Sequence, residues 1–268
     1  MKRKAMLLGA AAAVAISMGA ALTATVIGAG AAAHAQEAVP ANIAAAVADP
    51  SRPADDVARD AARKPADMLA LARVQPGQTV VDLIPGKGGE GYFTRLFSTA
   101  VGPNGTVYAF TPAEFAKFSK APVPASGAHI DPARPNVIFL VGPVNDFAPP
   151  TSVDLVWTSQ NYHDLHDSFA APADLAKVNA AIFRALKPGG LYVIEDHAAA
   201  AGSGLTATET LHRIDPAVVK TEVEAAGFVF DGESDVLNNP ADTHTLKVFD
   251  PVIRGHTDQF VFRFRKPG

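Results

Sequence analysis

A group of histidines and aspartates has residue types suited to proton transfer or to metal binding. Its members fall in segments that follow predicted strands or precede a predicted helix. In open α/β sheets such segments meet at the carboxyl ends of the strands, where ligands bind. The residues concerned are His163, His166, Asp196, His197 and His212.

This group supports two kinds of chemistry. In the first, His163 or His197 is a general base, because an imidazole with a pKa near 6.5 takes a proton at neutral pH and a carboxylate such as Asp164 or Asp196 can orient it. In the second, histidines and carboxylates together hold a divalent metal ion. We favour the base, with His163, Asp196, His197 and His212 as the catalytic residues, and we assign no metal ligand.

A glycine-rich turn lies between a predicted strand and a predicted helix. The β-branched run of residues 79–83 predicts the strand and residues 92–100 the helix, with Gly86, Gly88 and Gly91 between them. Glycines let the backbone approach a ligand closely, and the start of a helix offers free N–H groups. This unit therefore predicts a site for a cofactor that contains a nucleoside.

The glycine turn can be interpreted in two ways. Gly86-x-Gly88-x-x-Gly91 satisfies the dinucleotide pattern G-x-G-x-x-G. Counted from Asp82, the same residues approximate D-x-G-x-G-x-G, the first motif of class I S-adenosylmethionine-dependent methyltransferases, with Ile84 where that motif usually has a glycine. Since a glycine pattern alone is weak evidence, the surrounding elements have to decide.

The hydrophobic pattern predicts strands that alternate with helices. Short apolar runs predict strands at 79–83, 105–110, 137–141, 153–158, 191–194, 228–236 and 259–265. Apolar residues at helical spacing predict helices at 92–100, 175–186 and 216–226, and two short helices between 56 and 72 that Pro65 separates. This alternation implies an α/β fold, a doubly wound and mainly parallel sheet covered on both faces.

The first 35 residues have the features of a secretory signal peptide. Basic residues at positions 2–4 precede a long Ala/Gly-rich apolar stretch, and Ala33-His-Ala35 provides an A-x-A cleavage site. We therefore expect export to the periplasm with cleavage after Ala35, a linker over 36–56 and a single domain over 57–268. The apolar stretch is long enough to span a bilayer, so an uncleaved anchor, and with it a contact to the membrane, is the alternative.

Composition narrows the classes of partner. Without the three basic signal residues the chain carries 20 basic and 27 acidic residues, a net charge of −7. That balance argues against a nucleic-acid partner, and the absence of cysteine excludes disulfides and thiolate metal sites. Four charges in the 56–72 segment, on Arg59, Asp60, Arg63 and Lys64, fit either a solvated helix face or a helical lid over the cofactor.

The chain resembles class I S-adenosylmethionine-dependent methyltransferases, and in particular the exported predicted methyltransferases of bacteria. The resemblance covers about residues 42–267 and implies a methyltransferase-like, Rossmann-like strand order. The matching pieces are Arg63-Lys-Pro65, Asp82-Leu-Ile-Pro-Gly86, Gly91-Tyr-Phe-Thr94, Asn161-Tyr-His-Asp164, Leu186-Lys-Pro-Gly-Gly190, Glu195-Asp-His197, Leu211-His-Arg-Ile-Asp215, Ala226-Gly-Phe228 and Asp258-Gln-Phe-Val-Phe-Arg-Phe264.

The resemblance assigns a set of cofactor-binding residues. By it, Asp82, Gly86 and Gly88 would line the methionine and ribose part of S-adenosylmethionine. Asp146 and Phe147, which follow the third strand, would border the adenine, one as acceptor for its amino group and the other as a stacking ring.

The chain departs from the family at the end of its second strand. Family members usually place an acid there to bind the ribose hydroxyls. This chain has Phe110-Thr-Pro112, and Glu114 is the acid that could reach back. Loss of the hydroxyl contact would cost about 1–3 kcal/mol of binding free energy.

The expected function is S-adenosylmethionine-dependent methyl transfer to a small molecule. The cofactor is made in the cytoplasm, and nothing in the sequence explains its supply outside. Two alternatives follow: an exported binding protein that keeps the methyltransferase fold without activity, and a metal-assisted hydrolase that uses the histidine group. A nicotinamide oxidoreductase fits less well, since the ribose acid is absent.

Overall fold

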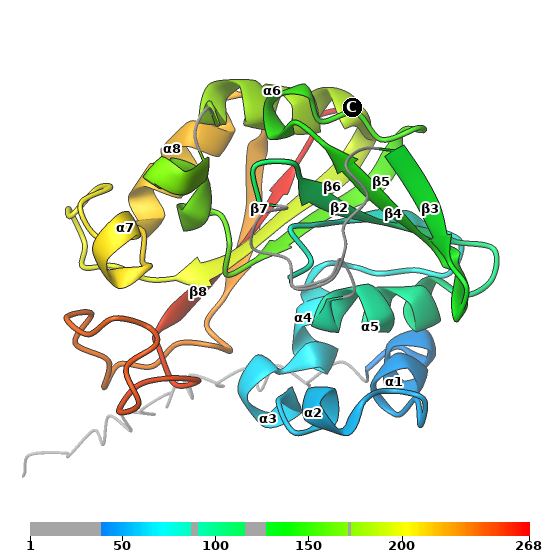
Figure 1. Ribbon diagram of the computed structural model, residues 1–268, viewed down its shortest axis with the longest axis horizontal. Helices are drawn as coiled ribbons and strands as arrows, with labels where there is room; N and C mark the ends of the chain where they lie inside the picture. Colours follow the sequence, from blue (N-terminus) through cyan, green and yellow to red (C-terminus); the bar gives the residue numbers. More distant parts are fainter. Residues whose placement is uncertain (1–38, 87–90, 116–126, 171–172) are drawn as a thin grey trace, which may run out of the picture. The chain divides into compact units, whose positions relative to one another are not determined.

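The computed structural model describes residues 39–86, 91–115, 127–170 and 173–268. The predicted signal peptide lies outside these residues, and so does Gly88. The described chain forms an eight-stranded sheet with helices on both faces (Figure 1). Its strands are β1 (Thr79–Leu83), β2 (Thr106–Pro112), β3 (Gly127–Asp131), β4 (Arg134–Gly142), β5 (Val153–Ser159), β6 (Leu186–His197), β7 (Val229–Ser234) and β8 (Gln259–Arg265).

The strand order is β3-β4-β2-β1-β5-β6-β8-β7. The five strands from β4 to β6 run parallel, and the order reverses between β1 and β5, which is the switch point where such sheets bind ligands. β8 lies antiparallel between β6 and β7. The doubly wound, mainly parallel sheet with Rossmann-like order is therefore confirmed.

The seven predicted strands are present, and the eighth, β3, is additional. β3 is an antiparallel edge strand paired with β4. Its described side chains from Ala128 to Ile130 are exposed, so it lacks the apolar pattern that would have identified it.

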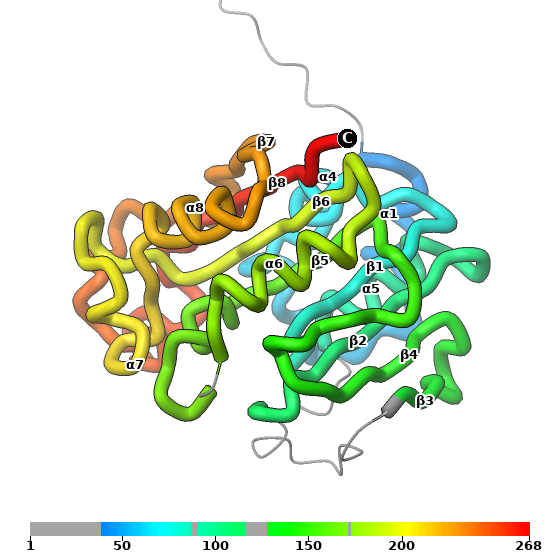
Figure 2. Tube along the Cα trace, turned by 90° about the horizontal axis from the view of Figure 1, so that it is seen from above, coloured from blue at the N-terminus to red at the C-terminus, as the bar shows by residue number. Residues whose placement is uncertain are grey.

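Helices cover the two faces of the sheet in separate groups, as Figure 2 shows from above. α6 and α8 pack on one face, while α1, α4 and α5 pack on the other. The helices are α1 (Ala41–Val47), α2 (Ala54–Val57), α3 (Asp60–Arg63), α4 (Pro65–Leu71), α5 (Tyr92–Val101), α6 (Leu175–Ala185), α7 (Thr208–Leu211) and α8 (Pro216–Ala225), with short 3₁₀ segments η2 (Val144–Asp146), η3 (His163–His166) and η4 (Ser168–Ala170). None of the helices among the described residues is long and apolar enough to cross a bilayer.

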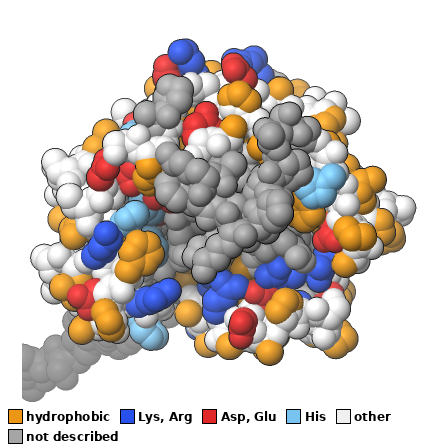
Figure 3. Space-filling model, viewed as in Figure 1, with side chains coloured by type: hydrophobic (Ala, Val, Ile, Leu, Met, Phe, Trp, Pro, Cys, Tyr) orange, Lys and Arg blue, Asp and Glu red, His pale blue; other side chains and the backbone are white. Residues whose placement is uncertain are grey.

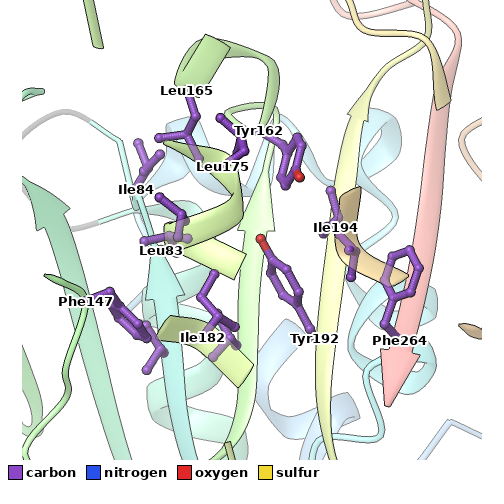
Figure 4. Close-up of a cluster of buried hydrophobic side chains, with 14 of the residues drawn as sticks. Leu83, Ile84, Phe147, Tyr162, Leu165, Leu175, Ile182, Tyr192, Ile194 and Phe264 are labelled. Atoms are coloured by element: carbon purple, nitrogen blue, oxygen red, sulfur yellow. The ribbon is translucent and has the colours of Figure 1, made fainter. Parts of the chain in front are cut away.

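Two apolar cores hold the helices to the sheet. Figure 4 shows part of the core beneath α6 and α8, to which β1 contributes Leu83, β6 contributes Ile194 and α6 contributes Ile182. The second core joins α1, α4 and α5 to the opposite face around Trp157, which is fully buried against Phe97. Burial on both faces explains why the central strands are continuous apolar runs.

The segment 36–56, expected to be a linker, is folded from α1 onward. Ile43 and Ala46 on α1 are fully buried in the second core, and the Asn42 side chain donates hydrogen bonds to the carbonyls of Val74 and Ala100. The expectation was wrong here because the alanines that suggested an unstructured segment are strong helix formers once Ile43 anchors the helix. Residues 54–71 likewise form three helices rather than two.

Candidate functional site

The turn after β1, at the switch point of the sheet, contains two residues with positive φ angles. Ile84 has φ of +59° and Gly86 has φ of +96°. A β-branched residue in the left-handed region costs about 1–2 kcal/mol, so its neighbours must hold it there. They do so through two hydrogen bonds: the Ile84 N–H donates to the Phe110 carbonyl at 2.9 Å, and the Asn161 amide donates to the Ile84 carbonyl at 3.0 Å.

The third glycine of the predicted pattern is required by packing. Gly91 caps α5, and a Cβ atom there would lie 1.9 Å from the carbonyl oxygen of Pro85. A Cβ atom at Gly86 would meet none of the described atoms within 4 Å, so among these residues nothing fills this side of the turn. The glycines thus serve two purposes: Gly91 lets the chain pass close to itself, and Gly86 keeps the space beside the turn free.

A cavity of about 170 Å³ opens beside this turn, and we call it the turn cavity. It combines the end of β1 with helix α3, the start of α5 and the residues after β5. Figure 3 shows basic side chains interspersed with acidic ones over the N-terminal helices on this face. The lining residues are Arg59, Arg63, Asp82, Ile84, Pro85, Gly86, Tyr92, Phe93, Ser159, Gln160 and Asn161.

The turn cavity contains one anion and one cation that have neutral partners. The Asp82 carboxylate accepts a hydrogen bond from the Thr94 hydroxyl at 2.5 Å. The Arg63 guanidinium donates to the Gln160 side-chain carbonyl at 2.9 Å and to the Ser159 hydroxyl at 3.4 Å. Among the described residues, no carboxylate lies within 4.0 Å of Arg63 in an ion pair.

Burial controls the charge of Asp82. Its side chain is 3% exposed, and this desolvation raises the pKa of the carboxyl to about 7, against the opposing effects of the Thr94 hydrogen bond and the Arg63 charge. A positively charged ligand group beside Asp82 would therefore favour the ionised form.

Gln160 links the turn cavity to the far strands of the sheet. Its side-chain amide donates to Glu195 and to Gln259, each at 3.1 Å, and its backbone φ is +59°. The Ser159 hydroxyl also donates to Glu195, whose burial raises the pKa of that carboxyl. This network positions the two groups that hold Arg63.

A second hollow of about 280 Å³, which we call the arginine hollow, continues from the turn cavity. Arg59, Arg63 and Gln160 line both spaces. The described residues that line the arginine hollow include a third arginine and one histidine but no carboxylate. They are Arg59, Ala62, Arg63, Gln160, His197, Val248, Phe249, Arg254, Gly255, Thr257 and Gln259.

The predicted catalytic residues come together around Asp196, which is fully buried. Its carboxylate is bonded to His163 Nδ1 at 2.7 Å and accepts the backbone N–H groups of His163 at 2.8 Å and His197 at 2.7 Å. On the other side of the His163 ring, Nε2 lies 3.1 Å from Asp164 Oδ1 and 3.3 Å from His212 Nδ1. We call these five residues the histidine cluster.

The two candidate bases have opposite protonation. Burial opposes a charge on His163, but the Asp196 charge and hydrogen bonds with Asp164 and Asp196 outweigh it and raise the pKa of the imidazole to about 10. Burial, aided by the charges of His163 and Arg213, lowers the pKa of His197 to about 4, although Asp196 opposes this. At neutral pH the His197 imidazole is therefore neutral; its Nδ1 is hydrogen-bonded to the Thr257 hydroxyl at 2.8 Å, and it lines the arginine hollow.

The predicted adenine residues lie elsewhere. Asp146 is exposed, Phe147 is buried edge-on against Phe110 with ring centroids 5.0 Å apart, and both line a different hollow beside α6. The Glu114 carboxylate accepts the backbone N–H of Val144 at 3.3 Å instead of facing the glycine turn. The structure therefore brings Asp82 and Gly86 together but places Asp146 and Phe147 outside the turn cavity.

Two residues of the site were not assigned from sequence. The sequence pattern identifies Arg63 only as one of four charges on a helix and gives Gln160 no role, yet both line the turn cavity and the arginine hollow. The available signal was positional: Gln160 directly follows the strand next to β1 across the switch point, and Arg63 belongs to one of the matching family pieces.

Comparisons with known proteins give likenesses in fold. No family model matches the chain, and no curated protein matches it. The chain is similar to the solved structure of a SAM-dependent methyltransferase from Aquifex aeolicus, at 17% identity and a TM-score of 0.49, covering 78% of this chain and 98% of that chain. For an S-adenosylmethionine-dependent methyltransferase from Mesorhizobium loti the values are 15%, 0.48, 77% and 99%.

A third similar structure is 1,6-didemethyltoxoflavin-N1-methyltransferase from Burkholderia thailandensis with bound 1,6-didemethyltoxoflavin and S-adenosylhomocysteine. The identity is 16% and the TM-score 0.47, with 80% of each chain covered. At such identities and TM-scores the likeness adds nothing beyond the fold, and the fold is established by the chain's own strand order.

Proposed function

We propose that the chain transfers a methyl group from S-adenosylmethionine to a small molecule. The observation that carries this proposal is that Asp82 and Arg63 line the same cavity and that each is hydrogen-bonded to neutral groups. An amino-acid zwitterion has the complementary charges, an ammonium for Asp82 and a carboxylate for Arg63. The methionine end of S-adenosylmethionine is such a zwitterion.

The described residues fit this end of the cofactor. The open side of Gly86 leaves space for a ligand against the backbone, and the start of α5 favours negative charge. S-adenosylmethionine, when bound, supplies the activated methyl group. The residues of the chain would hold the cofactor's charged end and so fix the position of the reacting carbon.

The adenosine end of the cofactor has fewer polar partners among the described residues. β2 ends at Thr111 and Pro112 without an acid, and Glu114 is engaged with Val144. We infer that the nucleoside is held by apolar contact and backbone groups, and that affinity depends on the methionine end more than is usual for the fold. Without an acid at the end of β2 to bind the ribose hydroxyls, we expect the binding free energy to be about 1–3 kcal/mol weaker than with that contact.

The arginine hollow is the proposed acceptor site. It adjoins the turn cavity, and Arg63 and Arg254 in its lining form no ion pair among the described residues, although Arg59 is paired with Asp56 at 2.5 Å. The two arginines favour an acceptor that carries an anionic group. His197 is the residue that would take the acceptor's proton, because it is neutral and faces this space. Its low pKa makes it a weak base, so orientation rather than proton removal would supply most of the rate.

Export is part of the proposal. The charged start, apolar stretch and Ala33-His-Ala35 site support a cleaved signal peptide and a periplasmic protein. Cell fractionation and N-terminal sequencing of the purified chain test this. A mature N-terminus at Gln36 is expected, and an intact Met1 on a soluble cytoplasmic protein would contradict export.

The cofactor assignment is tested by calorimetric titration with S-adenosylmethionine and S-adenosylhomocysteine, with NAD as the control ligand. Gly86→Asp adds a carboxylate to the turn cavity and should weaken binding at least 100-fold, about 2.7 kcal/mol. Gly77→Asp is the matched control, since Gly77 also has a positive φ of +81° and open surroundings but lies before β1.

Three outcomes are informative. Binding that Gly86→Asp removes and Gly77→Asp keeps would place the cofactor in the turn cavity. Equal binding by the two variants would place it elsewhere. No binding by the folded wild-type chain would refute the methyltransferase proposal.

A further inference from the structure

We propose that His163, Asp164 and His212 bind a divalent transition-metal ion of the Zn²⁺ type. This site is separate from the methyl-donor site and does not depend on the proposed function. Each of the three residues offers one ligand atom, and the three atoms lie close together at the edge of the histidine cluster.

The distances between the three ligand atoms match a tetrahedral metal site. His163 Nε2 lies 3.1 Å from Asp164 Oδ1 and 3.3 Å from His212 Nδ1, and His212 Nδ1 lies 3.4 Å from Asp164 Oδ1. A tetrahedral ion at about 2.0–2.1 Å from nitrogen and oxygen ligands separates those ligands by about 3.3–3.4 Å. The three atoms therefore already form one face of such a tetrahedron.

Asp196 supplies the outer support that a metal-binding histidine needs. Its carboxylate bonds His163 Nδ1 at 2.7 Å, so Nε2 is the nitrogen directed at Asp164 and His212, and a bound ion would displace the proton that Nε2 carries in the free chain. The carboxylate is itself fixed by two backbone N–H groups and is fully buried. Metal-ligating histidines almost always have such a partner on their second nitrogen.

A buried carboxylate oxygen beside the cluster provides a second observation. Asp167 follows η3 and is 3% exposed, and its Oδ1 has no hydrogen-bond partner among the described residues. Its backbone N–H donates to the Asp164 carbonyl at 3.2 Å, which places it next to the proposed ligands. Buried carboxylates are normally paired or coordinate metals, so a divalent cation beside Asp167 would supply the positive charge that this carboxylate lacks among the described residues.

The donor set indicates the class of metal. Two imidazoles and one carboxylate suit Zn²⁺, Co²⁺ or Fe²⁺, whereas Mg²⁺ and Ca²⁺ prefer oxygen ligands. Three protein ligands leave a fourth position, which is the arrangement of catalytic rather than structural sites. The His212 side chain, 20% exposed and beside the exposed Phe249, marks the open side.

The backbone at His212 is consistent with a fixed ligand position. His212 ends α7 with φ of +54°, a left-handed conformation that is uncommon for residues other than glycine. This conformation places its ring edge-on to His163, with ring centroids 5.4 Å apart. An arrangement that costs backbone energy is expected where a side chain must be held in place.

The test is metal binding by the full purified chain after treatment with a chelator. Calorimetry with Zn²⁺ and visible absorption spectroscopy with Co²⁺ should show one ion per chain, and the intense Co²⁺ bands of four-coordinate geometry should appear. Asp164→Asn and His212→Gln should each lower the affinity about 100-fold or more. His244→Gln is the matched control, because His244 also pairs with an aspartate, Asp258, at 2.9 Å but lies outside the cluster.

Thermal unfolding provides the second readout and guards against a variant that fails to fold. Zn²⁺ should raise the unfolding temperature of the wild type and of His244→Gln but not of His212→Gln, whose side chain is partly exposed. Absence of binding to the wild type, or equal binding by all variants, would overturn the proposal. Gly86→Asp should keep the metal, so failure of the methyl-donor site leaves this test unaffected.

Discussion

The turn cavity and the histidine cluster lie at the same edge of one sheet but are built in opposite ways. In the turn cavity, Asp82 and Arg63 face a shared space and are bonded to neutral side chains. In the histidine cluster, His163 is held between the carboxylates of Asp164 and Asp196. The turn cavity therefore has charged groups bonded to neutral partners, whereas the histidine cluster has charged groups paired with one another.

This difference predicts which charged groups gain most from a charged ligand. A charge that is already paired gains little from a ligand, whereas a charge with neutral partners gains a full charge-assisted hydrogen bond. We therefore expect loss of the buried Asp196 to act mainly on folding, changes at Asp164 and His212 to act on metal binding, and changes at Arg63 to act on binding of the methyl donor. Variants at Asp196, Asp82, His197 and Arg63 test this difference between the two regions.

Asp196→Ala is expected to have the largest effect, on folding. It leaves His163 without its buried partner and removes the acceptor of two backbone N–H groups. Breaking such a pair costs about 3–5 kcal/mol of unfolding free energy. Chemical denaturation measures this, with the exposed Asp235→Ala as a control expected within about 0.5 kcal/mol of wild type. Equal stability of the two variants would contradict the buried-pair interpretation.

Asp82→Asn is expected to change how stability depends on pH. The folded-state pKa of about 7 lies above the unfolded value of about 3.9, so between these values the folded chain binds one proton more than the unfolded chain. Asp82 therefore lowers the unfolding free energy as pH rises from 4 to 7, by up to about 1.4 kcal/mol per pH unit. The variant should lose this slope in denaturation curves, and an unchanged slope would argue against a raised pKa.

His197→Gln sharpens the contrast because its pH effect has the opposite sign. The folded-state pKa of about 4 lies below the unfolded value near 6.5, so the unfolded chain binds the extra proton in this range. His197 therefore makes stability rise with pH from 4 to 6.5, and the variant should flatten that rise. The two variants, measured over the same pH series, should deviate from wild type in opposite directions.

Arg63→Gln is expected to have the smallest effect of the four variants, and this effect should be on the free energy of ligand binding. Loss of a charge-assisted hydrogen bond costs about 1.5–3 kcal/mol, so the affinity for S-adenosylhomocysteine should fall about tenfold to 100-fold. Arg254→Gln is the control, because Arg254 lines the arginine hollow but not the turn cavity. A similar loss in both variants would show that Arg63 acts through general charge.

Much of the fold could be predicted from the sequence because its central strands are buried on both faces. The run 79–83 matches β1 residue for residue, and the predicted helix after the glycine turn matches α5 within one residue. β3 could not be predicted, since an exposed edge strand carries no apolar pattern. α1 was missed because its helical pattern is short and only Ile43 gives it an apolar anchor.

The candidate site could be predicted as a set of residues but not as an arrangement. Loops after β5 and β6 had to meet at one edge, and the structure does bring His163, Asp196, His197 and His212 together. His163 is charged because its ring lies between Asp196 and Asp164, a placement within a few ångströms that the spacing of these residues in the sequence does not reveal. The catalytic roles remain predictions.

A crystal structure of the chain with S-adenosylhomocysteine would show directly whether Asp82 and Arg63 bind the amino-acid end of the ligand. We predict that the ligand's carboxylate accepts hydrogen bonds from Arg63, that its ammonium donates to Asp82, and that the backbone of Gly86 contacts the ligand. A ligand bound with its amino-acid end away from Arg63 and Asp82, or one seated beside Asp146 and Phe147 alone, would contradict this prediction.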